Sequence, residues 1–87
     1  MKRYIIKEIA TGTESNTNFK GEVHTYYHGK QSSTAYTDDL AWFAKEYGYS
    51  TKAAGASAMK NQKENRDWFE QMYNTWIHKL ELVEMEV

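Results

Sequence analysis

Residues 21–28 are GEVHTYYH, and their alternation decides how the chain folds. Valine, threonine and tyrosine occupy every second position, and two histidines and another tyrosine lie between them. A period of two is typical of a strand whose successive side chains point to opposite faces of a sheet. The segment therefore predicts a β-strand that places Tyr27 on one face and Tyr26 on the other.

The segments around this strand extend it into a sheet. Residues 2–9 (KRYIIKEI) are rich in β-branched and aromatic side chains, so they predict a second strand, covered on both faces. The Thr, Ser, Asn and Gly of residues 11–18 predict the longest loop. Gly29 and Lys30 predict a turn, after which residues 32–36 would complete a hairpin as a short third strand.

The next segment has the pattern of an amphipathic helix. Thr37 is the expected N-cap, and Gly48 is the expected left-handed stop. Between them, apolar side chains recur at i, i+3, i+4 and i+7, which is the spacing of one helix face. This predicted core stripe consists of Leu40, Phe43, Ala44 and Tyr47.

A second helical region follows and leads into the last strand. Residues 51–63 carry small side chains that allow close packing, and Asn65 could cap a separate helix. No Gly or Pro separates the two parts, so one helix over residues 52–75 and two shorter helices both fit the sequence. Residues 78–87 (HKLELVEMEV) predict a final strand. The predicted core stripe of this helical region consists of Phe69, Met72, Tyr73 and Trp76.

Together these elements predict one α+β domain that spans residues 1–87. The expected architecture is a small antiparallel sheet of three or four strands, with two or three helices packed on one face and with the first and last strands as neighbours. A chain of 87 residues buries only about 60 to 70 % of its unfolded surface, so its core must be small.

Composition narrows the classes of function. The chain has no Cys and a net charge of −1, which excludes disulfides, thiolate metal sites and a strong field that would attract nucleic acid. Charges interrupt the N-terminal segment, and no apolar run approaches the roughly 20 residues of a membrane span, so neither a signal peptide nor membrane insertion is expected. A reducing cytosol suits such a chain, and a cytoplasmic location is expected.

No set of residues predicts catalysis or a cofactor. His24 and His28 would lie about 13 Å apart on a strand, which is too far to share a zinc ion. Gly29 and Lys30 lack the other residues of a phosphate-binding loop. Because no nucleophile and base can be assembled from adjacent motifs, we expect no enzymatic activity, no cofactor and no metal site.

Aromatic residues dominate the candidates for recognition, since the chain has seven Tyr, three Trp and three Phe. Trp42 and Trp68 lie off the centres of the helical stripes, so we expect them at the surface. Tyr and Trp often anchor protein interfaces, and the basic helix face that includes Lys52 could meet an acidic partner. The predicted partner-binding residues are Tyr26, Tyr27, Lys30, Tyr36, Trp42, Lys60, Lys63, Arg66 and Trp68.

Short strings over most of the chain resemble small proteins from phages and prophages of Gram-positive bacteria. The resemblance implies a protein that acts early in infection by binding a host protein, as anti-CRISPR proteins do, and it carries over no catalytic residue. The net charge of −1 departs from the acidic anti-CRISPR inhibitors that imitate DNA, so shape and aromatic contacts would have to replace charge. The strings are Tyr4-Ile5-Ile6-Lys7, Asn18-Phe19-Lys20-Gly21, Tyr26-Tyr27-His28-Gly29-Lys30, Thr37-Asp38-Asp39-Leu40, Tyr47-Gly48-Tyr49 and Glu81-Leu82-Val83-Glu84.

The sequence thus predicts a non-enzymatic protein-binding module, a phage-encoded inhibitor that blocks a surface of a host or defence protein in an infected or lysogenic bacterium. The alternative is a small nucleic-acid-binding protein, in which Tyr26, Tyr27 and Tyr36 stack on bases while Lys20 and Lys30 contact phosphates. Exposed sheet edges and the surplus of aromatic residues would also allow two copies to pair as a homodimer.

Overall fold

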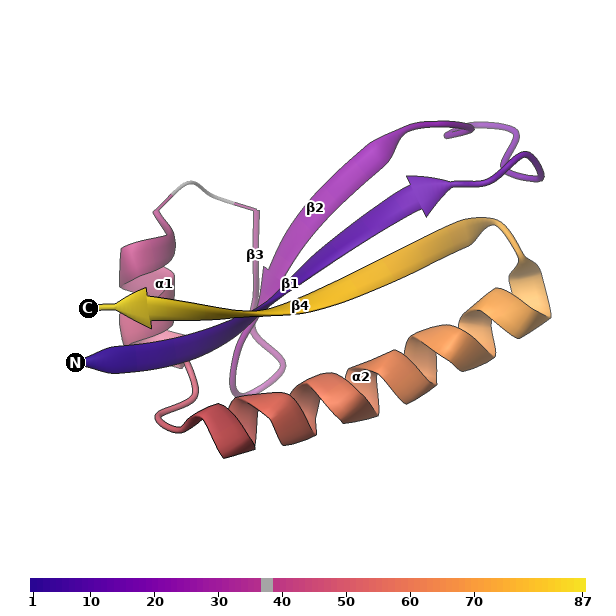
Figure 1. Cartoon of the computed structure of the whole chain (residues 1–87). Coiled ribbons are helices and arrows are strands. Elements are labelled where there is room, and N and C mark those ends of the chain that lie inside the picture. The colour runs from indigo at the N-terminus through magenta and orange to yellow at the C-terminus, as the bar shows by residue number, and fades with distance from the viewer. Residues whose placement is uncertain (37–38) are drawn as a thin grey trace.

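The computed structural model describes residues 1–36 and 39–87, and over these residues it has four strands and two helices (Figure 1). This arrangement confirms the predicted α+β class. The first and the last elements are both strands, and the other four elements lie between them in the sequence. The elements are β1 (Lys2–Gly12), β2 (Val23–His28), β3 (Thr34–Ala35), α1 (Leu40–Tyr47), α2 (Lys52–Tyr73) and β4 (Trp76–Glu86).

The four strands form one antiparallel sheet in the order β3-β2-β1-β4. The first and last strands are therefore neighbours, as predicted, and they pair without interruption from Lys2 opposite Glu86 to Gly12 opposite Trp76. β1 is a central strand and β4 is a long edge strand. The opposite edge is formed by β3, which has only two residues.

The two helices lie on opposite faces of the sheet, whereas the sequence predicts helices on one face only. Phe43 and Ala44 of α1 pack with Ile5 in the buried core, on the face to which the odd-numbered residues of β1 point. Gly55 of α2 lies against the side chains of Tyr4 and Leu82, on the other face. Both faces of β1 carry apolar residues, so each face needs its own cover.

α1 has its expected core stripe but different ends. Its N-cap is Asp39, whose side chain accepts a hydrogen bond from the backbone N–H of Trp42 at 3.3 Å. The expected cap, Thr37, lies outside the described residues. Gly48 follows the helix, but its φ of −69° and ψ of 149° are extended rather than left-handed, so any residue could adopt this backbone conformation. A side chain at Gly48 would instead collide with the carbonyl oxygen of Ala44, 2.4 Å from the added Cβ.

α2 is one helix of 22 residues, which resolves the two alternatives that the sequence left open. The hydroxyl of Thr51 caps it by accepting a hydrogen bond from the N–H of Ala54 at 3.1 Å. It ends at Asn74, whose left-handed conformation (φ 48°, ψ 31°) is one that asparagine tolerates well. Asn65 lies inside the helix, so the predicted cap at this position is wrong. Neither described helix combines the length and apolar character needed to cross a membrane.

Candidate binding site

Glu8 is the centre of the site, because β1 carries this carboxylate on the face that α2 covers. Its side chain is 2 % exposed. The strand register brings two histidines to it diagonally: His28 of β2 lies opposite Ile6 of β1, and His78 of β4 lies opposite Ala10 of β1. Diagonal neighbours on adjacent strands are within reach of long side chains. The sheet therefore gathers a carboxylate and two imidazoles from segments far apart in sequence.

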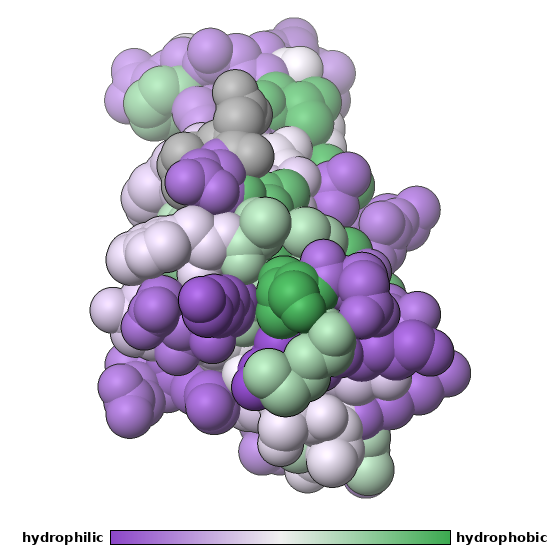
Figure 2. All heavy atoms as spheres, turned by 90° about the vertical axis from the view of Figure 1, so that its left-hand side faces the viewer, coloured by the Kyte–Doolittle hydropathy of each residue, from purple (hydrophilic) through white to green (hydrophobic). Residues whose placement is uncertain are grey.

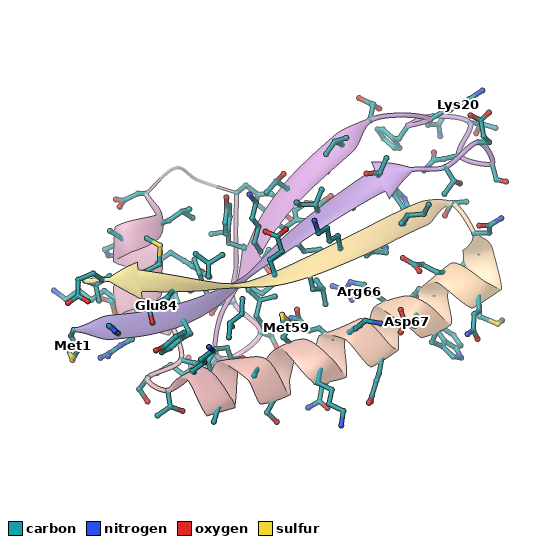
Figure 3. The ribbon with its side chains drawn as sticks, in the orientation of Figure 1. Met1, Lys20, Met59, Arg66, Asp67 and Glu84 are labelled. Atoms are coloured by element: carbon teal, nitrogen blue, oxygen red, sulfur yellow. The ribbon has the colours of Figure 1, made fainter. Side chains whose placement is uncertain are left out.

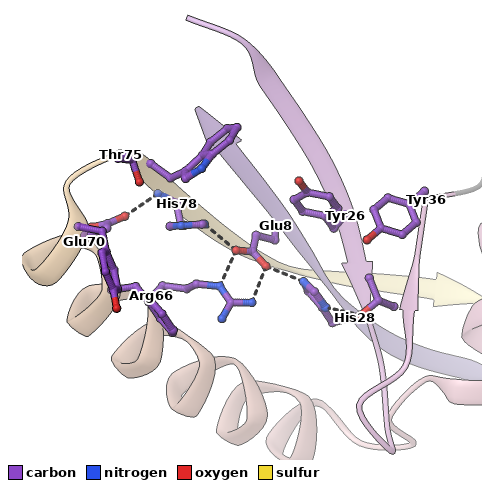
Figure 4. A pocket seen from close by; sticks show the side chains of 12 residues that line it. Glu8, Tyr26, His28, Tyr36, Arg66, Glu70, Thr75 and His78 are labelled. Carbon is purple, nitrogen blue, oxygen red and sulfur yellow. Dashed lines mark hydrogen bonds and ion pairs between the residues drawn. The ribbon is translucent and has the colours of Figure 1, made fainter. Parts of the chain in front are cut away.

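A guanidinium from α2 completes this group. Arg66 donates from Nε to Oε2 of Glu8 at 2.6 Å and from Nη2 to Oε1 at 3.0 Å. His28 Nε2 lies 2.6 Å from Oε1, and His78 Nδ1 lies 2.7 Å from Oε2 (Figure 4). Figure 3 shows Arg66 reaching from α2 toward the sheet. We call Glu8, His28, Arg66 and His78 the charge cluster.

The charge cluster keeps Glu8 ionised. Burial raises the pKa of the Glu8 carboxyl, but the hydrogen bonds from His28 and Arg66 and the positive charge of Arg66 outweigh burial and hold that pKa well below its usual range. Two-point pairing between arginine and a carboxylate is among the strongest hydrogen-bonded arrangements in proteins. The cluster therefore fixes α2 to the sheet through the buried carboxylate of Glu8, both of whose oxygens accept hydrogen bonds.

The two histidines differ in the hydrogen bonding of the ring nitrogen that does not contact Glu8. Nδ1 of His28 lies 3.2 Å from the hydroxyl of Thr34, which ties the cluster to β3. Among the described residues, nothing is hydrogen-bonded to Nε2 of His78. The backbone N–H of His78 donates to Oε1 of Glu70 at 2.6 Å, so α2 also holds the edge of β4 at this position.

A cavity of about 400 Å³ opens above the charge cluster, between the C-terminal half of α2 and the uncovered part of β2 and β3. Its size falls within the usual range for ligand-binding pockets. Aromatic rings form its walls: Tyr26 and Tyr36 make an edge-to-face pair with centroids 5.2 Å apart on the sheet side, and Phe69 and Tyr73 stack at 5.9 Å on the helix side. Its lining also includes Thr34, Glu70, Thr75 and Trp76.

Tyr26, one of these wall residues, lies where its surroundings favour the protonated hydroxyl. Burial, followed by the nearby Tyr36 and the negative charge of Glu8, raises the pKa of Tyr26. Its hydroxyl is therefore a hydrogen-bond donor throughout the neutral pH range. The cavity thus combines apolar rings with polar groups that are fixed in position.

The C-terminal half of α2 presents a row of apolar side chains to solvent. Trp68, Phe69, Met72 and Tyr73 are 52 %, 42 %, 59 % and 61 % exposed, and we call them the aromatic strip. The helical spacing of Phe69, Met72 and Tyr73 predicts that they lie in the core, and this prediction is wrong. β4 begins at Trp76, so that residue lies on a strand rather than on the helix.

The sheet near the C-terminal end of α2 adds further rings. Phe19, His24 and Trp76 contact one another, with centroid distances of 5.3 to 5.7 Å. The end of the molecule that carries α1 and both termini shows mostly hydrophilic residues, with hydrophobic residues among them (Figure 2). Phe19, Tyr36, Trp68, Phe69 and Tyr73 are exposed aromatic residues around the cavity and the aromatic strip, and Trp42 is exposed apart from them on α1.

The structure brings some of the predicted partner-binding residues together and separates others. Tyr26, Tyr36 and Arg66 line the cavity, and Trp68 belongs to the adjoining aromatic strip. Tyr27 lies on the other face and packs against the core, so it takes no part in this surface.

The remaining predicted residues lie elsewhere. Trp42 is 53 % exposed on α1, away from the cavity, and Lys30 lies in the turn after β2. Lys60 and Lys63 line a second cavity, of about 380 Å³, between α2 and β4.

The prediction that Arg66 belongs to a solvated basic helix face is wrong. Its side chain is one quarter exposed and is paired with Glu8. The sequence patterns do not reveal Glu8 as a site residue, and they predict isolated histidines on strands. The only signal was a charged residue in the alternate row of β1 that also contains Ile6 and Ala10. Recognising that signal requires the strand register, which no local pattern reveals.

The side chains of the charge cluster are bonded to one another. Both carboxylate oxygens of Glu8 are occupied by hydrogen bonds from three side chains. Within residues 1–36 and 39–87, no group of His, Asp or Glu side chains has an arrangement suited to a metal ion. All four side chains of the charge cluster also line the aromatic cavity.

No protein-family model, no curated protein and no solved structure matches the chain.

Proposed function

We propose that this protein is a non-enzymatic binding module that recognises another protein through the aromatic strip and the adjoining cavity. The observation that carries the proposal is the exposure of four large apolar side chains in a row on one half of α2. Contiguous apolar patches of this kind mark interaction sites on small soluble domains. Trp and Tyr are also the residues that most often dominate binding energy.

The charge cluster supports this role by fixing the surface in one shape. Arg66 lies on α2 just before the aromatic strip, and its guanidinium is bonded to Glu8 on the sheet. The strip and the sheet side of the cavity therefore move as one body. A preformed surface loses less conformational entropy on binding than a flexible one does.

The biological role that fits the resemblance to phage proteins is inhibition of a host or defence protein, of which an anti-CRISPR protein is one example. The module would occupy a functional surface of its target and exclude the target's substrate by steric blocking. With a net charge of −1, it would rely on shape and aromatic contacts rather than on imitation of nucleic acid. Its site of action would be the bacterial cytoplasm.

Comparative capture from a lysate of a Gram-positive host tests this proposal. Trp68→Ala/Tyr73→Ala is the disrupting variant, and Trp42→Ala is the matched control because Trp42 and Trp68 are 53 % and 52 % exposed on different helices. We expect one protein that wild type and Trp42→Ala retain and that the double variant loses. We also expect wild type, but not the double variant, to inhibit the activity of that protein. The proposal fails if all three folded baits retain the same set of proteins.

A second candidate function is binding of single-stranded nucleic acid, favoured by the Tyr26 and Tyr36 rings that stand beside Arg66 in one cavity. Aromatic rings can stack on bases. However, the basic residues nearby are already paired: Lys20 with Glu14 at 2.6 Å, and Arg66 with Glu8. If this candidate were correct, labelled single strands would bind, the affinity would fall steeply with salt, and Tyr26→Ala/Tyr36→Ala would abolish binding.

A further inference from the structure

The outer edge of β4 has free backbone groups over half of its length. Val87 and Met1 exchange two backbone hydrogen bonds, each 2.8 Å, so the odd-numbered residues of β4 are bonded to β1. The N–H and C=O groups of its even-numbered residues therefore point outward. Within the described residues, the side chain of Glu70 occupies the N–H of His78, whereas those of Leu80, Leu82 and Glu84 have no partner.

This edge has the features of a strand that pairs with another strand. β4 has 11 residues, no proline and an unbroken register with β1, so it contains no bulge that would turn its edge away. Natural proteins usually protect such edges. Here Glu70 protects only the end near His78, and residues 80–84 stay available.

We propose that two copies of this protein pair through their β4 strands, antiparallel and with Leu82 on the two-fold axis, to form one eight-stranded sheet. In this register the free groups of Leu80 in one copy bond to those of Glu84 in the other. A register centred on Glu81 would place two carboxylates opposite each other, which is unfavourable. A register centred on Leu80 would place His78 next to the axis and would need its N–H, which Glu70 already occupies, whereas the register centred on Leu82 places His78 only in the outermost pair, so residues 80–84 can pair without it.

Charge complementarity selects a second copy as the occupant of this edge. The second cavity lies where α2 meets β4, and its lining includes Lys60, Lys63 and Leu80. Residues directly opposite in a sheet point to the same face. The partner copy's Glu84, opposite Leu80, would therefore lie beside the two lysines, and the two-fold axis makes this contact twice. Glu84 and Lys63 have side chains that are 54 % and 69 % exposed, and within one copy they pair with Lys2 at 3.9 Å and with Asp67 at 3.1 Å. Contact with the partner copy would exchange these exposed pairs, whereas Lys60 has no ion pair among the described residues.

Near Gly55 the helices leave room for this pairing. A Cβ at Gly55 would meet Tyr4 on β1 and Leu82 on β4, so this part of α2 lies over the boundary between these strands, while the C-terminal part reaches the outer edge of β4 at His78 through Glu70. Strands lie about 4.8 Å apart, which would put the two α2 axes about 10 Å apart across the dimer, the usual spacing of packed helices. Ala53 and Ala56, both exposed, are small enough for that approach.

Charge reversal combined with analytical ultracentrifugation tests the dimer. We expect the wild type to reach twice the monomer mass of 10.2 kDa as its concentration rises. Glu84→Lys should repel the lysines of its partner, and Lys60→Glu/Lys63→Glu should repel the partner's Glu84, so each variant alone should dimerise about tenfold more weakly or not at all. Mixed together, the two variants should form a heterodimer, because both of its contacts join opposite charges.

The control is Lys45→Glu, an exposed position on α1 that should leave dimerisation unchanged. Circular dichroism of each variant checks that it is folded. A wild type that stays monomeric at every concentration would overturn the proposal. So would variants that dimerise like the wild type, or a mixture that stays monomeric. None of these outcomes bears on the aromatic strip, so this test and that of the proposed function are independent.

Discussion

At the scale of single residues, Glu8 determines whether the site exists, because it joins the sheet to α2 and to both histidines. Removing one partner from a buried ion pair typically costs 3 to 5 kcal/mol, since the remaining charges stay buried without compensation. Glu8→Gln keeps the size of the side chain and removes its charge. We expect it to lower the free energy of unfolding by about 3 kcal/mol in urea denaturation.

The matched control for this change is Glu64→Gln, an exposed glutamate on the same helix as Arg66. It should change stability by less than about 0.5 kcal/mol. If the two variants are equally stable, the hydrogen bonds around Glu8 contribute little and the charge cluster is not what fixes α2 to the sheet.

The charge cluster also predicts how stability depends on pH. The pKa of Glu8 is lower in the folded protein than in the unfolded chain, where it is about 4.3. Its contribution to stability is therefore fully present above that pH and is lost as the pH falls below it. In NMR spectra, the carboxyl carbon of Glu8 should keep its ionised chemical shift down to the pH at which the protein unfolds. A normal titration near pH 4 in the folded state would contradict this account.

At the scale of elements, Gly55 sets the distance between α2 and the sheet. A Cβ at this position would lie 2.9 Å from the end of the Leu82 side chain and 3.2 Å from Cβ of Tyr4. Gly55→Val should therefore destabilise the protein by about 1 to 3 kcal/mol, despite the better helix propensity of valine. Ser57→Val, at an exposed position two residues away, is the control and should have a small effect in thermal unfolding. An equal effect of both variants would show that α2 is not closely packed here.

The elements themselves were largely predictable, because their signals are local. The alternation in β2 and the stripe of α1 depend on neighbouring residues, and both elements form where the sequence predicts them. The burial of each helix face was less predictable. The repeat of Phe69, Met72 and Tyr73 has helical spacing, but spacing alone cannot tell a face that meets the core from one that meets solvent.

At the scale of the whole molecule, the site depends on register and on which face each helix covers. His28 and His78 are 50 positions apart, and they converge on Glu8 only because β1 lies between β2 and β4. The pairing of β1 with β4, which the sequence predicts, brings His78 to Glu8. The pairing of β1 with β2 brings His28. No sequence pattern specifies that α2 carries Arg66 to this face, so the charge cluster could not be predicted.

The whole molecule also explains why aromatic residues are exposed. α2 covers β1 and β4, while the same face of β2 and β3 has no helix above it among the described residues. Tyr26 and Tyr36 therefore line an open cavity instead of a core. The aromatic residues in the sequence are thus divided between a small core on the α1 side and an exposed surface on the α2 side, with Trp42 exposed on α1 itself.

The affinity for a partner protein captured by the wild type, measured by isothermal titration calorimetry, tests the central claim most directly. If the aromatic strip dominates binding, Trp68→Ala should weaken the affinity by about 2 kcal/mol, or roughly 30-fold, while Trp42→Ala should change it less than about threefold. Equal affinities for the wild type and a folded Trp68→Ala variant would contradict the claim.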